Sequence, residues 1–242
     1  MTAIRIGILV PSGNPTVEPE LYRMAPPAVT LHFARIDAAG GTPGAHEGME
    51  RRLLGYVDSF PVAVPPLAAV HPSVMVVAHT ALSYAVGFAN EPAMIDRLTT
   101  LAGCPIVTAS RAILAALAHL GVKHIALAVP YTEAIEELGA AYWNAAGLDV
   151  VTHRRLEGVT NIYDETEARA YALGLATDTP NADALLISGT GLPTAGIIQR
   201  LEDKIGKPVV TGQSAALWHA MRTAGVTARV TGYGRLLREP AE

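Results

Sequence analysis

Three segments in the first half of this 242-residue chain recur, in the same order, in the second half. Each segment joins a run of Val, Ile, Leu or Ala residues to a similar turn. The matching pairs are Ile6–Pro11 with Ile125–Pro130, Val76–Thr80 with Leu186–Thr190, and Gly103–Thr108 with Gly206–Thr211. The alternative explanation is that any two α/β halves share strand and turn vocabulary. The preserved order of the three matches favours an internal duplication, and therefore two similar lobes.

Short runs rich in Val and Ile alternate with longer helix-like stretches along the chain. This alternation is typical of parallel sheets with helices on their faces, and it predicts an α/β fold. The predicted strands are Ile4–Val10, Thr30–Ala34, Val74–Ala78, Ile106–Thr108, Ile125–Val129, Val150–Arg154, Ala184–Ile187 and Val209–Thr211. The predicted helices include Glu91–Leu101, Arg111–Leu120, Glu133–Ala145, Glu165–Leu175, Thr194–Ile205 and Ala215–Ala224. We assign residues 1–110 and 215–242 to the first lobe and 111–214 to the second, each with a parallel four-stranded sheet.

Residues typical of helix ends flank several of these helices. Ser110 and Thr132 stand where a side-chain oxygen would cap the first turn of a helix. Gly121 and Gly206 stand where a helix should end.

No membrane span is predicted. The apolar run Pro61–Val70 is broken by prolines and is too short for a membrane span.

The composition excludes several classes of protein. Hydrophobic residues make up 50% of the chain and charged residues 17%, which excludes a disordered chain. The net charge of -4, without a local basic cluster, predicts no nucleic-acid partner. Met1 leads directly into the predicted strand Ile4–Val10, which leaves no room for a signal peptide, so we expect a cytoplasmic protein.

Metal and disulfide sites are also not expected. The single cysteine, Cys104, cannot form an intramolecular disulfide or a cysteine-based zinc site, and the eight histidines lack metal-ligand spacing. No P-loop or dinucleotide-binding motif is present, so we predict neither a metal nor a cofactor. Cys104 is interpreted as a small buried hydrophobic residue of a core strand. Arg51-Arg52 and Arg154-Arg155 are interpreted as solvated surface pairs.

Polar residues follow the predicted strands of the first lobe, at the edge where open α/β sheets bind ligands. Ser12 and Asn14 lie in a Gly/Pro turn after the first strand, and their hydroxyl and amide groups suit a carboxylate. The same residues also make a good turn into a helix. His79 follows the third strand and suits acid–base chemistry, although a lone histidine there is more often a hydrogen-bonded structural residue.

The strands of the second lobe end in a comparable way. Tyr131 follows the first strand of that lobe and can donate a phenolic hydrogen bond into a cleft. Ser188, Gly189, Thr190 and Gly191 follow its third strand, and two glycines around a hydroxyl residue allow backbone N–H groups to point at an anion. A tight turn with positive φ explains the glycines equally well. Because the strand ends of both lobes face one crevice, we predict that these residues converge on a small ligand.

Longer stretches of the sequence resemble a known group of enzymes. The segment Val10–Glu18 resembles the amino-terminal signature of bacterial maleate isomerases. The segments Ala184–Thr194, Pro208–Ser214 and Gly232–Leu236 resemble the carboxyl-terminal part of arylmalonate decarboxylases. This resemblance to the aspartate/glutamate racemase superfamily implies two Rossmann-like lobes related by a pseudo-two-fold axis, with the active site in the cleft between them. Together with the apolar composition, it also implies a homo-oligomer.

Enzymes of this superfamily place one cysteine of each lobe at the cleft, and the resemblance carries both positions onto this chain. The second-lobe position falls on Gly189. The first-lobe position falls on Ala81 or, with a two-residue shift, on His79. None of these residues is a cysteine, so the resemblance implies a family site without its thiols.

The residues that hold the substrate in this superfamily are retained. Asn14, Tyr131 and Asn161 match the carboxylate-binding Asn, Tyr and Asn of the isomerases. Ser83, or Thr80 in the other register, would join Tyr131 and the amides of the second-lobe turn around a developing dianion. The resemblance therefore implies an intact cradle for an anion.

This pattern predicts a cofactor-free isomerase or lyase that acts on a small carboxylate through an enediolate- or carbanion-like state, without a cysteine nucleophile. His79 or Tyr131 would move the proton, and Thr190 or Ser188 would serve as a nucleophile only with His79 as its base. Two alternatives stay open. One is a hydrolase that opens a small cyclic amide or lactone, and the other is a binding protein that kept the cradle and lost catalysis.

Overall fold

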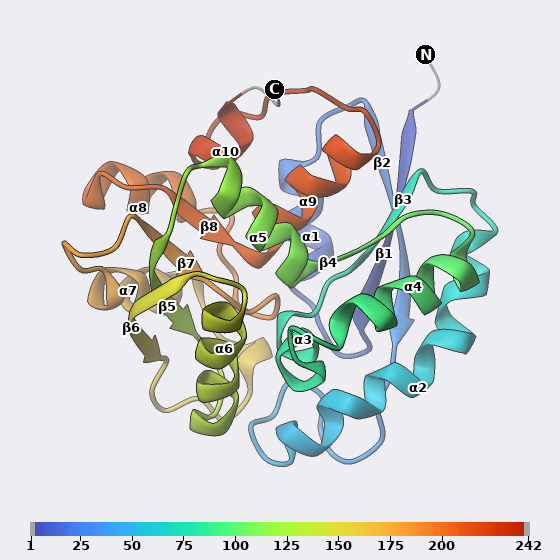
Figure 1. Cartoon of the computed structure of the whole chain (residues 1–242), viewed down its shortest axis with the longest axis horizontal. Coiled ribbons are helices and arrows are strands. Elements are labelled where there is room, and N and C mark those ends of the chain that lie inside the picture. The colour runs from blue at the N-terminus through green and yellow to red at the C-terminus, as the bar shows by residue number, and fades with distance from the viewer. Residues whose placement is uncertain (1–2, 240–242) are drawn as a thin grey trace.

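The computed structural model describes residues 3–239 and contains two parallel sheets of four strands each (Figure 1). The first sheet has the strand order β2-β1-β3-β4, and the second has the equivalent order β6-β5-β7-β8. The strands are β1 (Ile4–Pro11), β2 (Val29–Ile36), β3 (Val74–Val77), β4 (Ile106–Thr108), β5 (His124–Val129), β6 (Asp149–Arg155), β7 (Ala184–Ile187) and β8 (Val209–Thr211). All eight predicted strands are present and the matched sequence pairs occupy equivalent strands, so the predicted fold class is confirmed.

The inner strands are apolar on both faces because helices cover both sides of each sheet. Every residue of β3 and of β7 is buried. One hydrophobic cluster extends across both lobes and includes Ile8 of β1, Leu127 of β5 and Leu217 near the carboxyl end. Two further clusters each belong to a single lobe. The two lobes therefore share a core rather than meeting at a polar interface.

The helices alternate with the strands. They are α1 (Val17–Met24), α2 (Met49–Ala68), α3 (Thr80–Val86), α4 (Glu91–Ala102), α5 (Ala109–His119), α6 (Glu133–Ala145), the 3-10 helix η1 (Ile162–Asp164), α7 (Glu167–Thr177), α8 (Ile198–Ile205), α9 (Gly212–Thr223) and α10 (Arg235–Arg238). The six predicted helices are present with shifted ends, and α8 begins later than predicted. The helices α1, α2, α3 and α10 were not among the predicted ones.

Helix α2 continues through Pro61, Pro65 and Pro66, although prolines were expected to break this run. A proline in a helix interior costs about 3 kcal/mol. Pro65 and Pro66 lie in the last turn of α2, so Pro61 is the main interruption. The helix is maintained because one of its faces is buried in the first-lobe core. Burial of each large apolar side chain stabilises the fold by about 1.5–3 kcal/mol. That face includes Tyr56, Phe60, Val64 and Leu67.

The helix ends correct both predicted side-chain caps and confirm one predicted helix end. Thr108, rather than Ser110, caps α5, because its Oγ1 accepts a hydrogen bond from the backbone N–H three residues later (3.2 Å). Ser110 lies inside the first turn of that helix. Thr132 stands at the N-cap position of α6, but its hydroxyl donates to a glutamate of α2 instead (2.5 Å). Gly206 ends α8 in the left-handed conformation, with φ 73°, as predicted.

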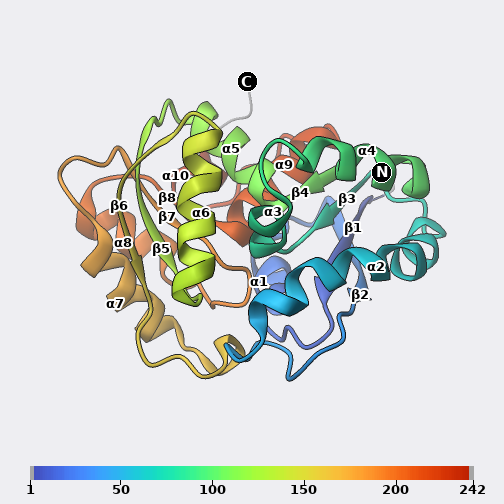
Figure 2. The same cartoon turned by 60° about the horizontal axis from the view of Figure 1, so that its bottom comes forward.

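The two sheets lie side by side, and α3 packs against α6 at their junction (Figure 2). Helices α5 and α9 also pack against each other there, and α9 contacts β3 and β4 of the first sheet as well as β8 of the second. The proposed lobe boundaries at residues 110 and 215 therefore stay a prediction. Within residues 3–239, every helix is too short or too polar to cross a membrane.

Candidate active site

A cavity of about 40 Å³ lies where the carboxyl ends of strands from both sheets meet. The residues Pro11, His79, Tyr131 and Thr190 come from the ends of β1, β3, β5 and β7, the four strand ends that the sequence predicts to converge. The lining residues are Pro11, Asn14, Gly44, Met49, Arg52, Leu53, Tyr56, His79, Ala81, Tyr131, Ile162, Tyr163, Thr190 and Gly191. A cavity of this volume holds a few water molecules and suits a small organic anion.

Asn14 and Thr16 connect the two lobes beside the cavity. The Asn14 Oδ1 accepts hydrogen bonds from the backbone N–H groups of Thr16 (2.8 Å) and Val17 (3.1 Å), at the start of α1. Its Nδ2 donates to the Thr190 carbonyl (3.3 Å), and the Thr16 hydroxyl donates to the Gly191 carbonyl (3.0 Å). The second N–H of the Asn14 amide has no hydrogen-bond partner among the described residues, so a ligand carboxylate can accept it.

His79 is held as a neutral ring at the cavity wall. Its Nδ1 accepts a hydrogen bond from the backbone N–H of Leu82 (3.2 Å), which caps α3. Burial lowers the pKa of His79 to about 4. Because Nδ1 is an acceptor, we assign the proton of the neutral ring to Nε2. His79 is therefore a hydrogen-bond donor and a poor base at neutral pH. Ala81, the other candidate for the first cysteine position, also lines the cavity.

Tyr131 and Thr80 form a buried pair of hydroxyl groups whose oxygens are 2.7 Å apart. Burial raises the pKa of Tyr131 to about 12, so the phenol keeps its proton at neutral pH. Thr80 does not line the cavity and acts on it through Tyr131. When Thr80 donates to the phenol oxygen, the Tyr131 proton is free to stabilise an oxyanion in the cavity.

The turn after β7 brings backbone groups, not a nucleophile, to the cavity. The Thr190 hydroxyl donates to the Ala78 carbonyl (2.8 Å), and a carbonyl is not a base, so the geometry does not support Thr190 as a nucleophile. Gly189 has φ 147°, and a Cβ placed on it would lie 2.6 Å from the Pro130 Cδ. The position carried over from the second family cysteine is therefore closed to a side chain.

Five predicted substrate-binding residues lie outside the cavity lining, because their polar groups serve other parts of the fold or are buried within it. One of them is Thr80, whose hydroxyl pairs with Tyr131. Ser12 donates to the carboxylate of an aspartate after β2 (2.8 Å), and Ser188 is hydrogen-bonded to a tyrosine hydroxyl of α3. Asn161 donates to a carbonyl before α2 (3.1 Å) and caps η1 by accepting a backbone N–H (2.9 Å). Ser83 is buried within α3. The contacts of these residues with a ligand stay a prediction.

The loop between β2 and α2, residues 37–48 and here called the roof loop, crosses from the first lobe to the second. The backbone N–H of Ile162 donates to the Gly44 carbonyl (2.9 Å). The His46 Nε2 lies 2.8 Å from the Pro130 carbonyl oxygen, just before Tyr131. Since Gly44 lines the cavity, these contacts hold part of its wall against the second lobe.

Helix α2 contributes the largest group of lining residues that sequence reasoning missed. Met49, Arg52, Leu53 and Tyr56 lie on one face of the helix, at the spacing of successive turns. Arg52 was interpreted as a surface residue but is only 3% exposed, which is a correction. This periodicity was available in the sequence, but the prolines that follow concealed the helix. Tyr163, after β6, gave no sequence signal.

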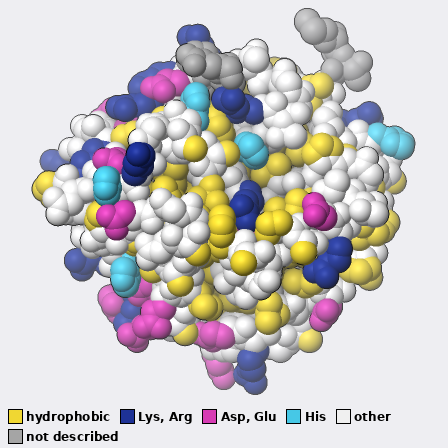
Figure 3. All heavy atoms as spheres, viewed as in Figure 1, with side chains coloured by type: hydrophobic (Ala, Val, Ile, Leu, Met, Phe, Trp, Pro, Cys, Tyr) yellow, Lys and Arg dark blue, Asp and Glu magenta, His cyan; other side chains and the backbone are white. Residues whose placement is uncertain are grey.

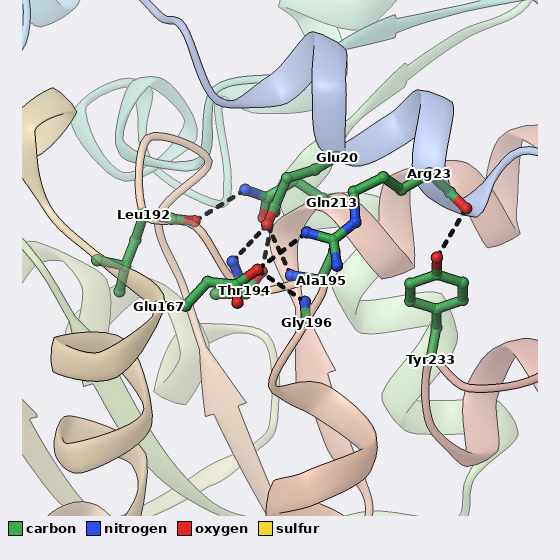
Figure 4. Close-up of polar contacts among 9 residues, drawn as sticks. All are labelled: Glu20, Arg23, Glu167, Leu192, Thr194, Ala195, Gly196, Gln213 and Tyr233. Atoms are coloured by element: carbon green, nitrogen blue, oxygen red, sulfur yellow. Dashed lines mark hydrogen bonds and ion pairs between the residues drawn. The ribbon is translucent and has the colours of Figure 1, made fainter.

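Figure 4 shows how α1 holds the loop that follows β7. The Glu20 Oε1 accepts hydrogen bonds from the backbone N–H groups of Thr194 and Ala195, both at 2.6 Å. Glu167 accepts the next N–H, that of Gly196, at 3.2 Å. Two carboxylates therefore bind three successive amides of one loop, and Glu20 reaches them from the first lobe.

Gln213, at the start of α9, supports the same loop from the other side. Its Nε2 donates to the carbonyls of Thr190 and Leu192, both at 3.1 Å. Figure 4 shows the bond to Leu192. The Thr190 carbonyl thus accepts from both Gln213 and Asn14. The Thr190 main chain is held by Asn14 and Gln213 and its side chain by Ala78, so the cavity wall it forms is preorganised.

No group of three His, Cys, Asp or Glu residues that could hold a metal occurs in residues 3–239. The charged and hydrogen-bonding side chains at the cavity include Arg52, the neutral ring of His79, the phenol of Tyr131 and the amide of Asn14. Such a set can bind a carboxylate and stabilise negative charge that develops beside it.

Comparisons with known proteins agree with this geometry. The family model described as arylmalonate decarboxylase matches residues 6–237. The arylmalonate decarboxylase of Bordetella bronchiseptica is 35% identical over 168 residues, which cover 66% of this chain and 69% of that protein. The maleate isomerase of Nocardia farcinica is 29% identical over 251 residues, covering 97% and 96% of the two chains. The solved maleate isomerase of Pseudomonas putida S16 has the same fold, with a TM-score of 0.88 and 23% identity over 98% of each chain.

The buried Glu20 predicts a pH dependence of stability. Burial raises the pKa of Glu20 from 4.5 to about 7, so the folded state binds this proton more tightly than the unfolded state does. The stability that this tighter proton binding adds to the folded state is fully present below about pH 4.5 and is lost as the pH rises through 7. Glu20→Gln keeps an acceptor for both amides but does not titrate. We therefore expect its free energy of unfolding, relative to that of the native chain, to be about 2–3 kcal/mol higher at pH 8 than at pH 5. Urea unfolding at the two pH values measures this difference, and an equal difference at both would contradict it.

The closed position at Gly189 predicts a steric penalty. Gly189→Ala adds a Cβ against Pro130 in a positive-φ conformation, and we expect it to lower the free energy of unfolding by about 2–4 kcal/mol. Gly147→Ala is the matched control, since Gly147 has φ 87° but no atom within 4 Å of an added Cβ. We expect this control to cost only about 1 kcal/mol. Equal losses in urea unfolding would show that Pro130 does not close the position.

Proposed function

Because this chain belongs to the arylmalonate decarboxylase family, and its cavity is built from hydrogen-bond donors without a thiol, we propose that it decarboxylates a small dicarboxylate. Membership of this group makes the chain an isomerase or a lyase. The finer assignment rests on one observation. The single cysteine, Cys104, packs in the first-lobe core cluster of α2 and α4, away from the cavity.

Loss of carbon dioxide requires charge stabilisation more than it requires a nucleophile. The bond between the α-carbon and one carboxylate breaks, and its electrons remain on the α-carbon. They are delocalised into the retained carboxylate, which becomes an enediolate. Tyr131 and the free N–H of Asn14 are fixed donors for this developing charge. Because these donors are held in place before the reaction, little reorganisation is needed.

The α-carbon must then receive a proton. His79 is already neutral at pH 7 and has no imidazolium proton to give. Tyr131 keeps its phenolic proton at neutral pH, and its partner Thr80 can stabilise the phenolate that forms. We therefore assign proton delivery to Tyr131 and hydrogen bonding of the carboxylate to His79. Solvent restores the Tyr131 proton after the product leaves.

The competing functions have less support. Isomerisation through a thiol adduct needs a cysteine at the cavity, and hydrolysis of a lactone or cyclic amide needs a base to activate water. The pKa of His79, about 4, makes it a poor base at neutral pH. A binding protein would need no proton donor, yet Tyr131 and Thr80 are buried as a hydroxyl pair beside the cavity. Decarboxylation therefore fits the described residues best.

Proton NMR in deuterated buffer tests the reaction directly. We expect an arylmalonate or alkylmalonate to lose carbon dioxide and to gain deuterium at its α-carbon, while maleate is not isomerised. Cys104→Ala should turn over at the native rate, because Cys104 lies in the core cluster. Formation of fumarate from maleate, ring opening of a lactone, or loss of activity in Cys104→Ala would each contradict the proposal.

Two substitutions test the assigned roles. Tyr131→Phe removes the proton donor, and we expect kcat to fall by about 10²–10⁴-fold. His79→Asn keeps a side-chain acceptor for the cap of α3 but removes the imidazole and its Nε2–H, so we expect a smaller loss of about 10²-fold or less. His79→Ala, which loses the cap as well, should also be about 1 kcal/mol less stable in urea. A larger loss of kcat in His79→Asn than in Tyr131→Phe would reverse the two roles.

A further inference from the structure

Arg52 is a buried cation at the cavity. Its exposed fraction is 3%, although most Lys and Arg side chains of the described chain lie on the surface, scattered over the face seen in Figure 3. It projects from the first turn of α2 and lines the cavity. Across residues 3–239, no Asp or Glu oxygen lies within 4 Å of it as an ion-pair partner. Its charge is therefore not neutralised by the described protein.

The guanidinium group is only partly satisfied by the roof loop. Its Nη1 donates to the carbonyls of Glu47 (2.6 Å) and Gly40 (3.4 Å), and its Nη2 donates to the carbonyl of Ala45. These three bonds use three of the five N–H groups that a guanidinium carries. Carbonyl oxygens bring partial negative charge only, so a full positive charge and two donors remain.

The surroundings of Arg52 do not supply an anion. None of the described residues that line the cavity is an Asp or a Glu. Glu47 and Glu50, on either side of the α2 start, are exposed, and Glu50 accepts a hydrogen bond from Thr132. Asp37, at the start of the roof loop, accepts hydrogen bonds from Ser12 and from the backbone N–H of Ala38, and it forms no ion pair with Arg52. A buried charge without a counter-ion is costly, so an anion in the cavity would be strongly favoured.

The effect of Arg52 on two tyrosines places its charge at the cavity wall. Burial raises the pKa of both Tyr56 and Tyr163, and the Arg52 charge opposes the rise in each case. Both tyrosines line the cavity, on the side of α2 and η1. The field of Arg52 therefore acts inside the cavity and not only on the roof loop.

We propose that Arg52 is the counter-ion of one carboxylate of the bound substrate, and thereby selects anionic over amide or ester groups at that end of the cavity. The inference rests on the proposed function for the identity of the ligand. A cation on a departing carboxylate would hold back its loss as carbon dioxide. Arg52 therefore binds the group that keeps its charge, and it adds a full positive charge to the donors around the enediolate.

Arg52 also organises the roof loop, so the test must separate the two roles. Arg52→Gln removes the charge and most of the donors. His46→Ala is the matched control, because it removes a contact that closes the roof loop, between His46 and Pro130, and leaves the charge in place. Arg52→Lys keeps the charge but has fewer donors, so it cannot serve the roof-loop carbonyls and an anion together.

The experiment is thermal unfolding of the full chain at pH 7.5 with malonate, maleate, their monoamides or sulfate, against chloride at equal ionic strength. We expect malonate at about 100 times its Kd to raise the Tm of the native chain and of His46→Ala by about 5 °C or more. The monoamides should raise it less. The same malonate concentration should raise the Tm of Arg52→Gln by less than about 1 °C. If Arg52→Gln does not fold, Arg52→Lys should bind malonate at least about tenfold more weakly than the native chain.

Three results would overturn the inference. The first is that Arg52→Gln binds malonate with a Kd within about twofold of the native value. The second is that His46→Ala loses the malonate-induced rise in Tm as completely as Arg52→Gln does. The third is that none of the anions raises the Tm of the native chain more than chloride does. The outcome is separate from that of the proposed function. Decarboxylation that persists without Arg52-dependent anion binding rejects only the role of Arg52, whereas Arg52-dependent binding without decarboxylation rejects only the reaction.

Discussion

The contact between α1 and the loop after β7 is the interaction on which the cavity depends. Asn14, Thr16 and Glu20 lie on one short segment of the first lobe, and each bonds to main-chain groups of the second lobe. The Glu20 carboxylate accepts two amides at the cost of losing its hydration, which is why its pKa is raised. In return, the loop that carries Thr190 is held against the strand ends of the other sheet.

The resemblance carries two family cysteine positions to this cavity, and this chain has no cysteine at either. His79, one of the two candidates for the first position, caps a helix, and Gly189, at the second, leaves no space for a side chain beside Pro130. Glycine offers no nucleophile, and His79 is a poor base at neutral pH. Tyr131 and Asn14, which the resemblance implies as substrate-binding residues, line the same cavity. Chemistry in such a site is restricted to reactions in which stabilising a developing charge lowers the barrier sufficiently.

The sheets and their strand ends could be predicted because runs of Val and Ile indicate strands that are buried on both faces. The identity of several site residues could not, because a side chain near a strand end can turn either way. Ser12 and Ser188 point to other partners, and nothing local to their sequence reveals this. Arg52 was missed for a different reason, since three prolines concealed the helix whose periodicity places it on a buried face. Long-range contacts, not local patterns, decide these positions.

The hydrophobic cluster that joins the two lobes also sets the order in which the chain can fold. The first sheet is complete once β4 has been made, yet α9, which packs against β3 and β4, is among the last elements of the chain. A nascent chain on the ribosome therefore carries an uncovered apolar face until residues 212–223 emerge. The partners of Glu20 also arrive late, at residues 194 and 195. Such late, distant pairings give slow folding, and they make chaperone binding during synthesis the expected protection for the unfinished first lobe.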